Sequence, residues 1–499
     1  MLHEPPAPLS TGNEGLDLIL KGGLPRNRLY LVEGTPGAGK TTLGLRFLLD
    51  GVAAGEPVLY ITLSETSEEL QGVAQSHGWS LNGIELFEMS ATEEVFGGAT
   101  EQSILHPWEA ELSDTIRLIQ EQVERVRPTR VVFDSLSEMR LLAQDSLRYR
   151  RQILALKQYF AGRAITVLLV DDLSGAKDGR DNHLHSICHG VITLERLTLE
   201  FGAARRRLQI QKLRGIDFIA GFHDFIIGKG GLQVFPRMIA AKPLHAFNAE
   251  PTPSGVPELD RLLAGGPLRG TSTLITGPAG SGKTTVALAY LAAACARGEA
   301  CTIYEFDERI ATLLSRAENM GIPLKGYIDS GHLVVQQIDP AQISPGEFAW
   351  RVRSEVEHRG SRMIVIDSLN GYLAAMPQEQ QLILQMHEML SYLSQLGVVT
   401  FLINPQHGLV GSMSTSLNIS YVADAVVLIR FFEAEGRLRK AISVLKHRGG
   451  AHEDAIRELR IDHKGVRVGE PLTNFKGVLT GTPEYHGQSA PLLEGRNGD

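Results

Sequence analysis

Two short stretches of the chain, residues 34–42 and 277–285, have the residue types and spacing needed to bind a nucleoside triphosphate. Both fit the P-loop pattern G-x-x-x-x-G-K-[ST]. Its glycines let backbone N–H groups point at the phosphates, its lysine neutralises phosphate oxygens, and its hydroxyl ligates Mg²⁺. We therefore expect the chain to bind ATP with Mg²⁺ at two sites. The predicted nucleotide-binding residues are Gly37, Ala38, Gly39, Lys40, Thr41, Thr42, Gly280, Ser281, Gly282, Lys283, Thr284 and Thr285.

An aspartate follows a run of apolar residues after each P-loop, at residues 131–134 and 364–367. This is the Walker B pattern, in which a buried strand brings its terminal carboxylate to the Mg²⁺. The pattern alone is weak, because many buried strands end in Asp. Its position after a P-loop and an intervening strand makes it specific. The predicted metal ligands are Thr41, Asp134, Thr284 and Asp367.

Acidic residues also end the first strand that follows each P-loop. The apolar run 58–63 leads to Glu65, and the run 301–304 leads to Asp307 and Glu308. A carboxylate at this edge of an α/β sheet can orient or deprotonate the water that attacks the γ-phosphate. The alternative is an acid that interacts with the dipole of the next helix. We predict that these three carboxylates are catalytic.

A further buried strand in each half ends in polar residues, Asp171-Asp172 in the first and Asn404-Pro405 in the second. These ends either sense the γ-phosphate or cap the loop that follows, since Asp and Asn are common in turns. The sequence leaves both alternatives open.

A K-x-R-G motif occurs late in each half, at residues 212–215 and 446–449. Two cations two residues apart on one strand point to the same face, where they can meet an anion. In a closed ring this anion would be a phosphate bound to the neighbouring subunit. A solvated edge strand is the alternative. The predicted contacts to the neighbour's nucleotide are Lys212, Arg214, Lys446 and Arg448. By contrast, residues 205–207 are three arginines that we interpret as a solvated hairpin without a counterpart in the second half.

The elements that position these residues indicate a duplicated domain. The P-loop lysines are 243 residues apart (283 − 40), and the Leu-Asp pairs at 16–17 and 259–260 have the same separation. Strand, P-loop and helix follow one another in both halves. We predict an α/β fold of two tandem P-loop NTPase domains, each a mostly parallel twisted sheet flanked by helices. The predicted segments are a flexible arm (1–10), an N-terminal domain (11–239), a linker (240–253), a C-terminal domain (254–480) and a flexible tail (481–499).

Composition narrows the class of protein. The 499 residues exceed what one core usually holds, and the net charge of −8, without a block of like charge, argues against a dedicated nucleic-acid binder. The longest apolar runs, such as 164–170, are too short to span a bilayer. The three cysteines lack CxxC spacing, so we expect reduced thiols in a cytoplasmic protein.

Taken together, these paired motifs resemble the KaiC family, the ATPase and autokinase core of the cyanobacterial circadian clock and its relatives. The resemblance covers about residues 10–485. It implies two tandem RecA-like domains and a two-tiered homohexamer with ATP between neighbouring subunits. It also implies that the N-terminal tier is mainly an ATPase, and that the C-terminal tier also transfers phosphate to a hydroxyl pair of its own chain.

The family's site residues fall on specific positions of this chain. Its paired catalytic glutamates correspond to Ser64-Glu65 and Asp307-Glu308, so the first pair has lost one acid. Its phosphorylated Ser-Thr pair corresponds to Ser420-Tyr421. Ser420 keeps an acceptor hydroxyl, whereas Tyr421 carries its hydroxyl several ångströms further out on a rigid ring. Serine/threonine autokinase activity is therefore expected near Ser420, and the tyrosine argues against a two-site timing cycle.

We expect a nucleotide-driven homohexamer that acts in signalling or as a clock. Its expected partners are other copies of the chain and signalling or clock proteins, and neither nucleic acid nor a membrane. One alternative is a RecA-type DNA-dependent ATPase or recombinase, against which the acidic balance and the lack of a basic-aromatic loop argue. The other is a non-catalytic nucleotide-gated scaffold.

Overall fold

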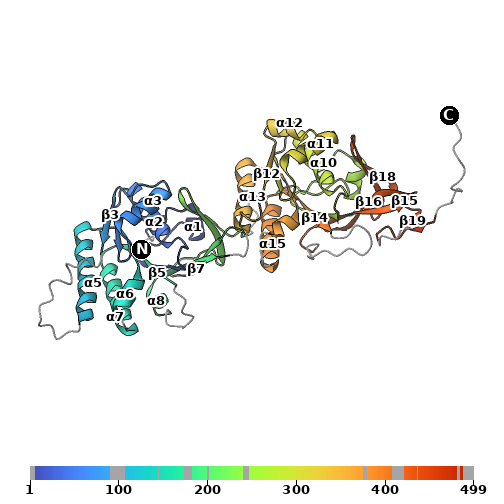
Figure 1. Ribbon diagram of the computed structural model, residues 1–499. Helices are drawn as coiled ribbons and strands as arrows, with labels where there is room; N and C mark the ends of the chain where they lie inside the picture. Colours follow the sequence, from blue (N-terminus) through green and yellow to red (C-terminus); the bar gives the residue numbers. More distant parts are fainter. Residues whose placement is uncertain are drawn as a thin grey trace, which may run out of the picture. The chain divides into compact units, whose positions relative to one another are not determined.

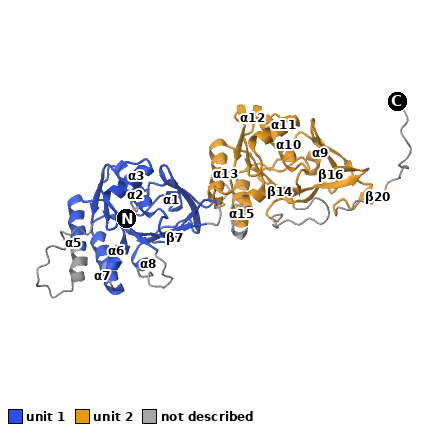
Figure 2. Cartoon of the chain, viewed as in Figure 1, with its two compact units in different colours: residues 1–237 blue, residues 238–499 orange. Residues whose placement is uncertain are grey.

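The computed structural model divides into two compact units, residues 1–237 and 238–499, each described here by itself (Figure 2). The residues that it describes are 6–89, 107–143, 145–173, 182–198, 202–239, 247–374, 379–406, 421–434, 436–479 and 484–486. Ser420, the predicted phosphoacceptor, lies outside them.

The first unit is built on a nine-stranded sheet in the order β3-β2-β4-β5-β1-β6-β7-β8-β9. Strands β3 to β6 in this order pair in parallel, and β6 to β9 pair antiparallel. The strands are β1 (Leu29–Gly34), β2 (Val58–Thr62), β3 (Ile84–Glu88), β4 (Arg130–Asp134), β5 (Thr166–Asp172), β6 (Gly190–Leu197), β7 (Arg205–Leu213), β8 (Phe222–Gly228) and β9 (Gly231–Phe235). The helices are α1 (Glu14–Ile19), α2 (Lys40–Ala53), α3 (Ser67–Ser76), α5 (Pro107–Val126), α6 (Leu136–Ala143), α7 (Ser146–Ala161) and α8 (Asn182–Ile187).

The second unit repeats this order as β12-β11-β13-β14-β10-β15-β16-β17-β18. Its strands are β10 (Ser272–Pro278), β11 (Cys301–Glu305), β12 (Leu333–Gln337), β13 (Met363–Asp367), β14 (Val399–Gln406), β15 (Ala425–Ala434), β16 (Arg437–His447), β17 (Arg457–Asp462) and β18 (Gly465–Pro471), with a separate pair β19 (Phe475–Lys476) and β20 (Glu484–Tyr485). Its helices are α9 (Pro257–Leu262), α10 (Lys283–Ala296), α11 (Ile310–Asn319), α12 (Leu324–Asp329), α13 (Pro345–Arg359), α14 (Leu369–Ala374) and α15 (Glu379–Gln395).

Helices cover both faces of each sheet (Figure 1). In the first unit, one core contains side chains of α1, α2 and α3, and the other contains side chains of α5, α6, α7 and α8. The parallel strands between them, such as β2 and β4, are buried at every position because both of their faces are covered. The predicted α/β class and the two tandem sheets are confirmed.

The edges of the predicted domains need correction. Leu9 forms a bridge with Leu24 and is only 2% exposed, so the flexible-arm assignment is wrong for the last residues before position 11. In the same way, Pro251 bridges Leu268, and Thr252 is buried, so the last residues of the predicted linker belong to the second unit. These short segments lack a periodic pattern, and only their apolar contacts reveal their place.

The predicted flexible tail is also wrong at one point. Tyr485 in β20 pairs with Phe475 in β19, and their rings lie 5.2 Å apart. This contact continues a small apolar cluster around Phe432. A tilted aromatic pair and a short strand pairing therefore hold part of the segment beyond residue 480 against the second unit.

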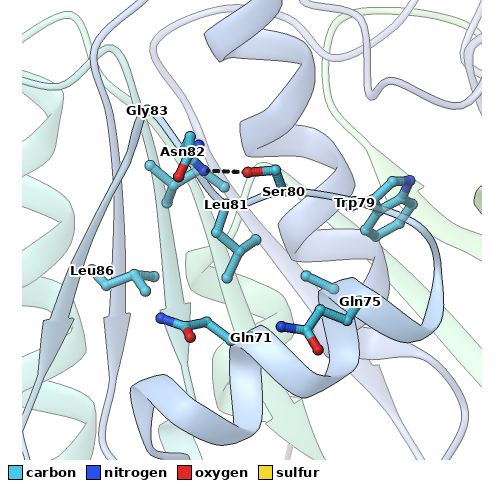
Figure 3. A pocket seen from close by; sticks show the side chains of 10 residues that line it. Gln71, Gln75, Trp79, Ser80, Leu81, Asn82, Gly83 and Leu86 are labelled. Atoms are coloured by element: carbon cyan, nitrogen blue, oxygen red, sulfur yellow. Dashed lines mark hydrogen bonds between the residues drawn. The ribbon is translucent and has the colours of Figure 1, made fainter.

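Helix α12 of the second unit has no counterpart among the described residues of the first. In the second, α12 contacts α11 and β12, whereas only a short loop joins the corresponding α3 and β3 in the first. A hollow of about 590 Å³ lies at this place in the first unit, lined by α3 (Gln71, Gln75), the loop with Trp79 and Asn82, and Leu86 of β3 (Figure 3). Within the described residues, no helix is long and apolar enough to cross a membrane.

Candidate active sites

Each P-loop connects the central strand of its sheet to a helix. Gly37 and Gly39 have φ angles of 72° and 101°, and Gly280 and Gly282 have 74° and 103°, all in the region that favours glycine. Helices α2 and α10 begin directly afterwards, at Lys40 and Lys283. Each helix therefore directs its N-terminal N–H groups and positive dipole end at the loop, which is the arrangement that binds phosphate.

The two P-loop lysines are buried but have different surroundings. The ammonium group of Lys40 donates to the carbonyls of Gly34 (3.1 Å) and Thr35 (3.2 Å) and lies 2.5 Å from a carboxylate oxygen of Asp172. The ammonium group of Lys283 donates to the carbonyl of Pro278 (2.8 Å), and burial lowers its pKa to about 8.

The predicted metal ligands come together in both units. The Thr41 hydroxyl lies 3.0 Å from Asp134 Oδ2, and the Thr284 hydroxyl lies 2.5 Å from Asp367 Oδ2. Burial raises the pKa of both aspartates. A hydroxyl beside a buried carboxylate that lacks a full counter-charge is an oxygen donor set that suits Mg²⁺.

Glu65 lies next to this pair in the first unit. Its Oε1 is 3.5 Å from the Thr41 hydroxyl, and its Oε2 is buried without a hydrogen-bond partner among the described residues. Burial, together with the negative charges of Asp134 and Glu69, raises the pKa of Glu65 to about 7. The side chain of Thr62 holds the turn by bonding to the backbone N–H and carbonyl of Glu65. A carboxylate with such a pKa is suited to accept a proton near neutral pH.

The second unit has more acids at the same place, and two of them have side-chain partners. Asp307 accepts a hydrogen bond from the Ser368 hydroxyl, and Glu308 forms an ion pair with Arg316 (2.5 Å). A third carboxylate, Glu305, ends β11 and is only 1% exposed. Burial raises its pKa to about 9, with Asp367 contributing.

Our sequence reasoning missed Glu305. The offset of 243 residues pairs it with Thr62, whose hydroxyl shapes the turn before Glu65. Comparison of the two halves at this offset would have revealed that a carboxylate replaces a hydroxyl at the end of the strand.

The K-x-R cations bond to their own chain in the described part of the structure. Lys212 donates to the carbonyls of His185 and Cys188, and Lys446 donates to that of Ala423. The guanidinium groups also donate to backbone carbonyls, that of Arg214 to Ser186 (3.2 Å) and that of Arg448 to Tyr421 (3.0 Å). The motif therefore fastens the end of β7 or β16 to the segment that precedes β6 or β15. Tyr421, the second predicted acceptor, is 54% exposed.

Residues 205–207 lie on β7, which forms an antiparallel hairpin with β6, but the interpretation that they have no counterpart is wrong. Arg206 on β7 lies opposite Arg196 on β6, and Lys440 on β16 occupies the equivalent position (440 − 206 = 234, as for 446 − 212). The surroundings of Gly37 and Gly282 show that Arg196, the strand partner of Arg206, and Lys440 lie beside the P-loops. A Cβ added to Gly37 would lie 3.1 Å from Arg196, and one added to Gly282 would lie 4.0 Å from Lys440. A cation therefore flanks each P-loop within its own domain.

Comparison with known proteins agrees with this duplicated site. A family model described as "ATPase: KaiC" matches residues 9–239 and 252–473. The chain is 28% identical over 489 residues to the "Circadian clock protein KaiC3" of Synechocystis sp., covering 96% of this chain and 95% of that protein. It is 29% identical over 499 residues to the "Circadian clock oscillator protein KaiC" of Synechococcus elongatus, covering 96% and 92%. It is also 29% identical to the KaiC of Thermosynechococcus vestitus, covering 94% and 90%.

Proposed function

Because the chain belongs to the KaiC family of ATPases, we propose that it binds and hydrolyses Mg²⁺-ATP in both domains and phosphorylates itself in the second. The observation that carries this proposal is the repeated group of P-loop lysine, threonine hydroxyl and Walker B aspartate, with a carboxylate beside it in each unit, Glu65 in the first and Asp307 in the second. All of these groups come from the same edge of the sheet, where α/β proteins bind ligands.

Hydrolysis in the first domain follows from the positions of its residues. Bound Mg²⁺ would supply positive charge to the β- and γ-phosphates. Lys40 neutralises phosphate oxygens, while Glu65 takes a proton from the water that attacks the γ-phosphorus. The bond between this phosphorus and the bridging oxygen breaks, and ADP leaves with that oxygen. The unbonded Oε2 of Glu65 supports the role of proton acceptor.

The second domain differs in ways that support phosphotransfer to its own chain. Asp307 and Glu308 are held by Ser368 and Arg316, so neither is poised for water in the manner of Glu65. If Arg316 releases Glu308, this carboxylate can take the proton of a serine or threonine hydroxyl as it attacks the γ-phosphorus. We propose Ser420 as the acceptor and Tyr421 as the second candidate.

We propose that both domains act in a homohexamer, with Lys212 and Arg214, or Lys446 and Arg448, reaching the nucleotide of the neighbouring subunit. These cations are held by hydrogen bonds to backbone carbonyls before β6 and β15. This supports a role at the neighbour's nucleotide, because a preorganised cation loses less conformational freedom when it meets phosphate. Signalling or clock proteins would read the nucleotide and phosphorylation state of the ring.

Intact-protein mass spectrometry after incubation with Mg²⁺-ATP tests the autokinase proposal. We expect the mass of one phosphate to appear in the native protein and in the Lys40→Ala variant, and to be absent from Lys283→Ala. The Ser420→Ala variant should lose the modification. A chain that gains no phosphate would contradict autokinase activity. A gain that survives Ser420→Ala would contradict the acceptor, and Tyr421→Phe then identifies whether the tyrosine is modified instead.

A further inference from the structure

The two P-loop lysines differ in one contact that the repeat does not preserve. Strand β5 pairs with β1 so that Asp172 lies beside Gly34, the first glycine of the loop. From this position its carboxylate reaches the ammonium group of Lys40 at 2.5 Å. With the carbonyls of Gly34 and Thr35, this gives the three N–H groups of the ammonium three acceptors.

The second unit has no carboxylate at the equivalent position. Strand β14 pairs with β10 in the same way, but the residue beside Gly277 is Pro405. Among the described residues, the ion pairs of the second unit do not include Lys283, whose hydrogen bond goes to the Pro278 carbonyl. The register of the sheets thus places an acid against one P-loop lysine and a proline near the other.

An ammonium ion that bonds to the β- and γ-phosphates cannot keep its three protein acceptors. Lys40 is 8% exposed, so its pairing with Asp172 is shielded from water on the lysine side. When the lysine turns to the phosphates, the Asp172 carboxylate loses its counter-ion. It is then left beside the negatively charged phosphates of the bound nucleotide. Both effects oppose binding of an anion.

We propose that Asp172 competes with the nucleotide for Lys40, so that the N-terminal site binds ATP more weakly than it would without this carboxylate. This inference rests on the proposed function of the P-loop. It assigns Asp172 a role that neither γ-phosphate sensing nor loop capping describes. It also makes the two sites unequal, since among the described residues only the N-terminal P-loop lysine has a carboxylate that competes with the phosphates.

The test measures Mg²⁺-dependent binding of a fluorescent ATP analogue to the full chain, with one site disabled at a time. In the Lys283→Ala background, which isolates the N-terminal site, Asp172→Asn should tighten binding about tenfold, as expected for loss of one competing ion pair of about 1.4 kcal/mol. The control Glu121→Gln removes the same charge from an exposed position on α5 and should leave the affinity unchanged. In the Lys40→Ala background, Pro405→Asp should weaken binding at the C-terminal site.

The possible results separate failure of the competition by Asp172 from failure of nucleotide binding at the first P-loop. A Lys283→Ala protein that binds no analogue would refute nucleotide binding at the first site, and the inference with it. If the parent binds and Asp172→Asn binds equally well or more weakly, the inference alone is overturned. Weaker binding with slower turnover in Asp172→Asn would instead make this carboxylate a group that holds the metal ion or the water. Tighter binding with the control unchanged supports the competition.

Discussion

At the scale of single residues, Glu65 is the group on which the proposed hydrolysis in the first domain depends. We expect Glu65→Gln to lower the turnover of this domain at least 100-fold, as is common when a general base is lost, while ATP binding is retained. Measurement of ATPase rate and affinity in the Lys283→Ala background isolates the domain. Because the pKa of Glu65 is raised to about 7, the native rate should fall as pH decreases through 7, since the protonated acid cannot accept a proton.

The control for this variant is Glu68→Gln, which changes an exposed acid three residues further along the chain. It should leave both the rate and the pH profile unchanged. A Glu65→Gln protein with normal turnover would show that another group activates the water. A lost rate together with lost binding would make Glu65 part of the phosphate site rather than the base.

Glu305 allows a second prediction at this scale, which concerns stability. Its pKa is raised from 4.5 to about 9, so the folded protein binds a proton that the unfolded chain releases between these values. Keeping this proton costs the folded state no stability below about pH 4.5, but the loss of stability grows as pH rises toward 9. Glu305→Gln, which removes the ionisable group, should therefore raise the melting temperature of the nucleotide-free second domain by several degrees at pH 8 and much less at pH 5. An equal shift at both pH values would contradict this explanation.

The contrast between these two acids shows what the sequence can predict about a site. Glu65 is predictable because it follows a strand after a P-loop, and the threonine–aspartate pairs of the proposed metal site follow from the same order of elements. Glu305 is visible only when the two halves are compared at their offset, and its burial, which raises its pKa, is known only from the structure. The contact between Lys40 and Asp172 depends on the register between β1 and β5, which no local pattern contains.

At the scale of secondary-structure elements, the β8–β9 hairpin of the first unit depends on a buried histidine. His223 is 1% exposed, its Nδ1 accepts from the backbone N–H of Arg237, and its Nε2 lies 2.9 Å from the carbonyl of Ile219. This arrangement requires the neutral ring, in which Nε2 donates. Burial accordingly lowers the pKa of His223 to about 4.

A histidine with a depressed pKa makes stability fall in acid. The unfolded chain binds a proton near pH 6.5, whereas the folded chain resists it until about pH 4, so stability is lost as pH falls from 6.5 to 4. The loss amounts to about 3 kcal/mol for a shift of this size. Urea unfolding of the first unit at pH 7 and 4.5 should show it. His223→Gln, which cannot protonate, should lower stability at pH 7 and flatten the pH dependence. An unchanged slope would assign the acid sensitivity to other groups.

The sequence predicts the order of the helices and strands better than it predicts where the two domains begin and end. Strand, P-loop, helix and Walker B strand follow from hydrophobic runs that recur at a constant offset. The bridge between Leu9 and Leu24 was not predictable, because a single residue has no periodicity. Helix α12 lies within a connection that has different lengths in the two halves, where comparison of the halves gives no guide.

At the scale of the whole molecule, the proposed ring requires that one subunit complete the site of the next. Within the described residues, Lys212 and Arg214 bond to their own chain near β6, and Glu65 and Lys40 lie at the P-loop. If the arginine acts on the neighbour's nucleotide, Arg214→Ala should lower hydrolysis about 1,000-fold, the lower range for an arginine finger, without loss of ATP binding. Light scattering should show ATP-dependent growth from a 54.5 kDa chain to six copies, and Lys40→Ala should impair this assembly more than Lys283→Ala does.

Mixed rings give the decisive measurement, because they separate a residue that acts in its own subunit from one that acts across the interface. Arg214→Ala and Glu65→Gln subunits, both in the Lys283→Ala background, should each be inactive alone. When they are mixed and assembled with ATP, every interface that joins an intact Glu65 to a neighbour's intact Arg214 regains hydrolysis. Replacing the Glu65→Gln partner with a subunit that carries both changes removes every such interface, so no activity should return. Recovery in the first mixture alone requires the arginine to act in the neighbouring site, whereas two inactive mixtures would place both residues in the site of a single subunit.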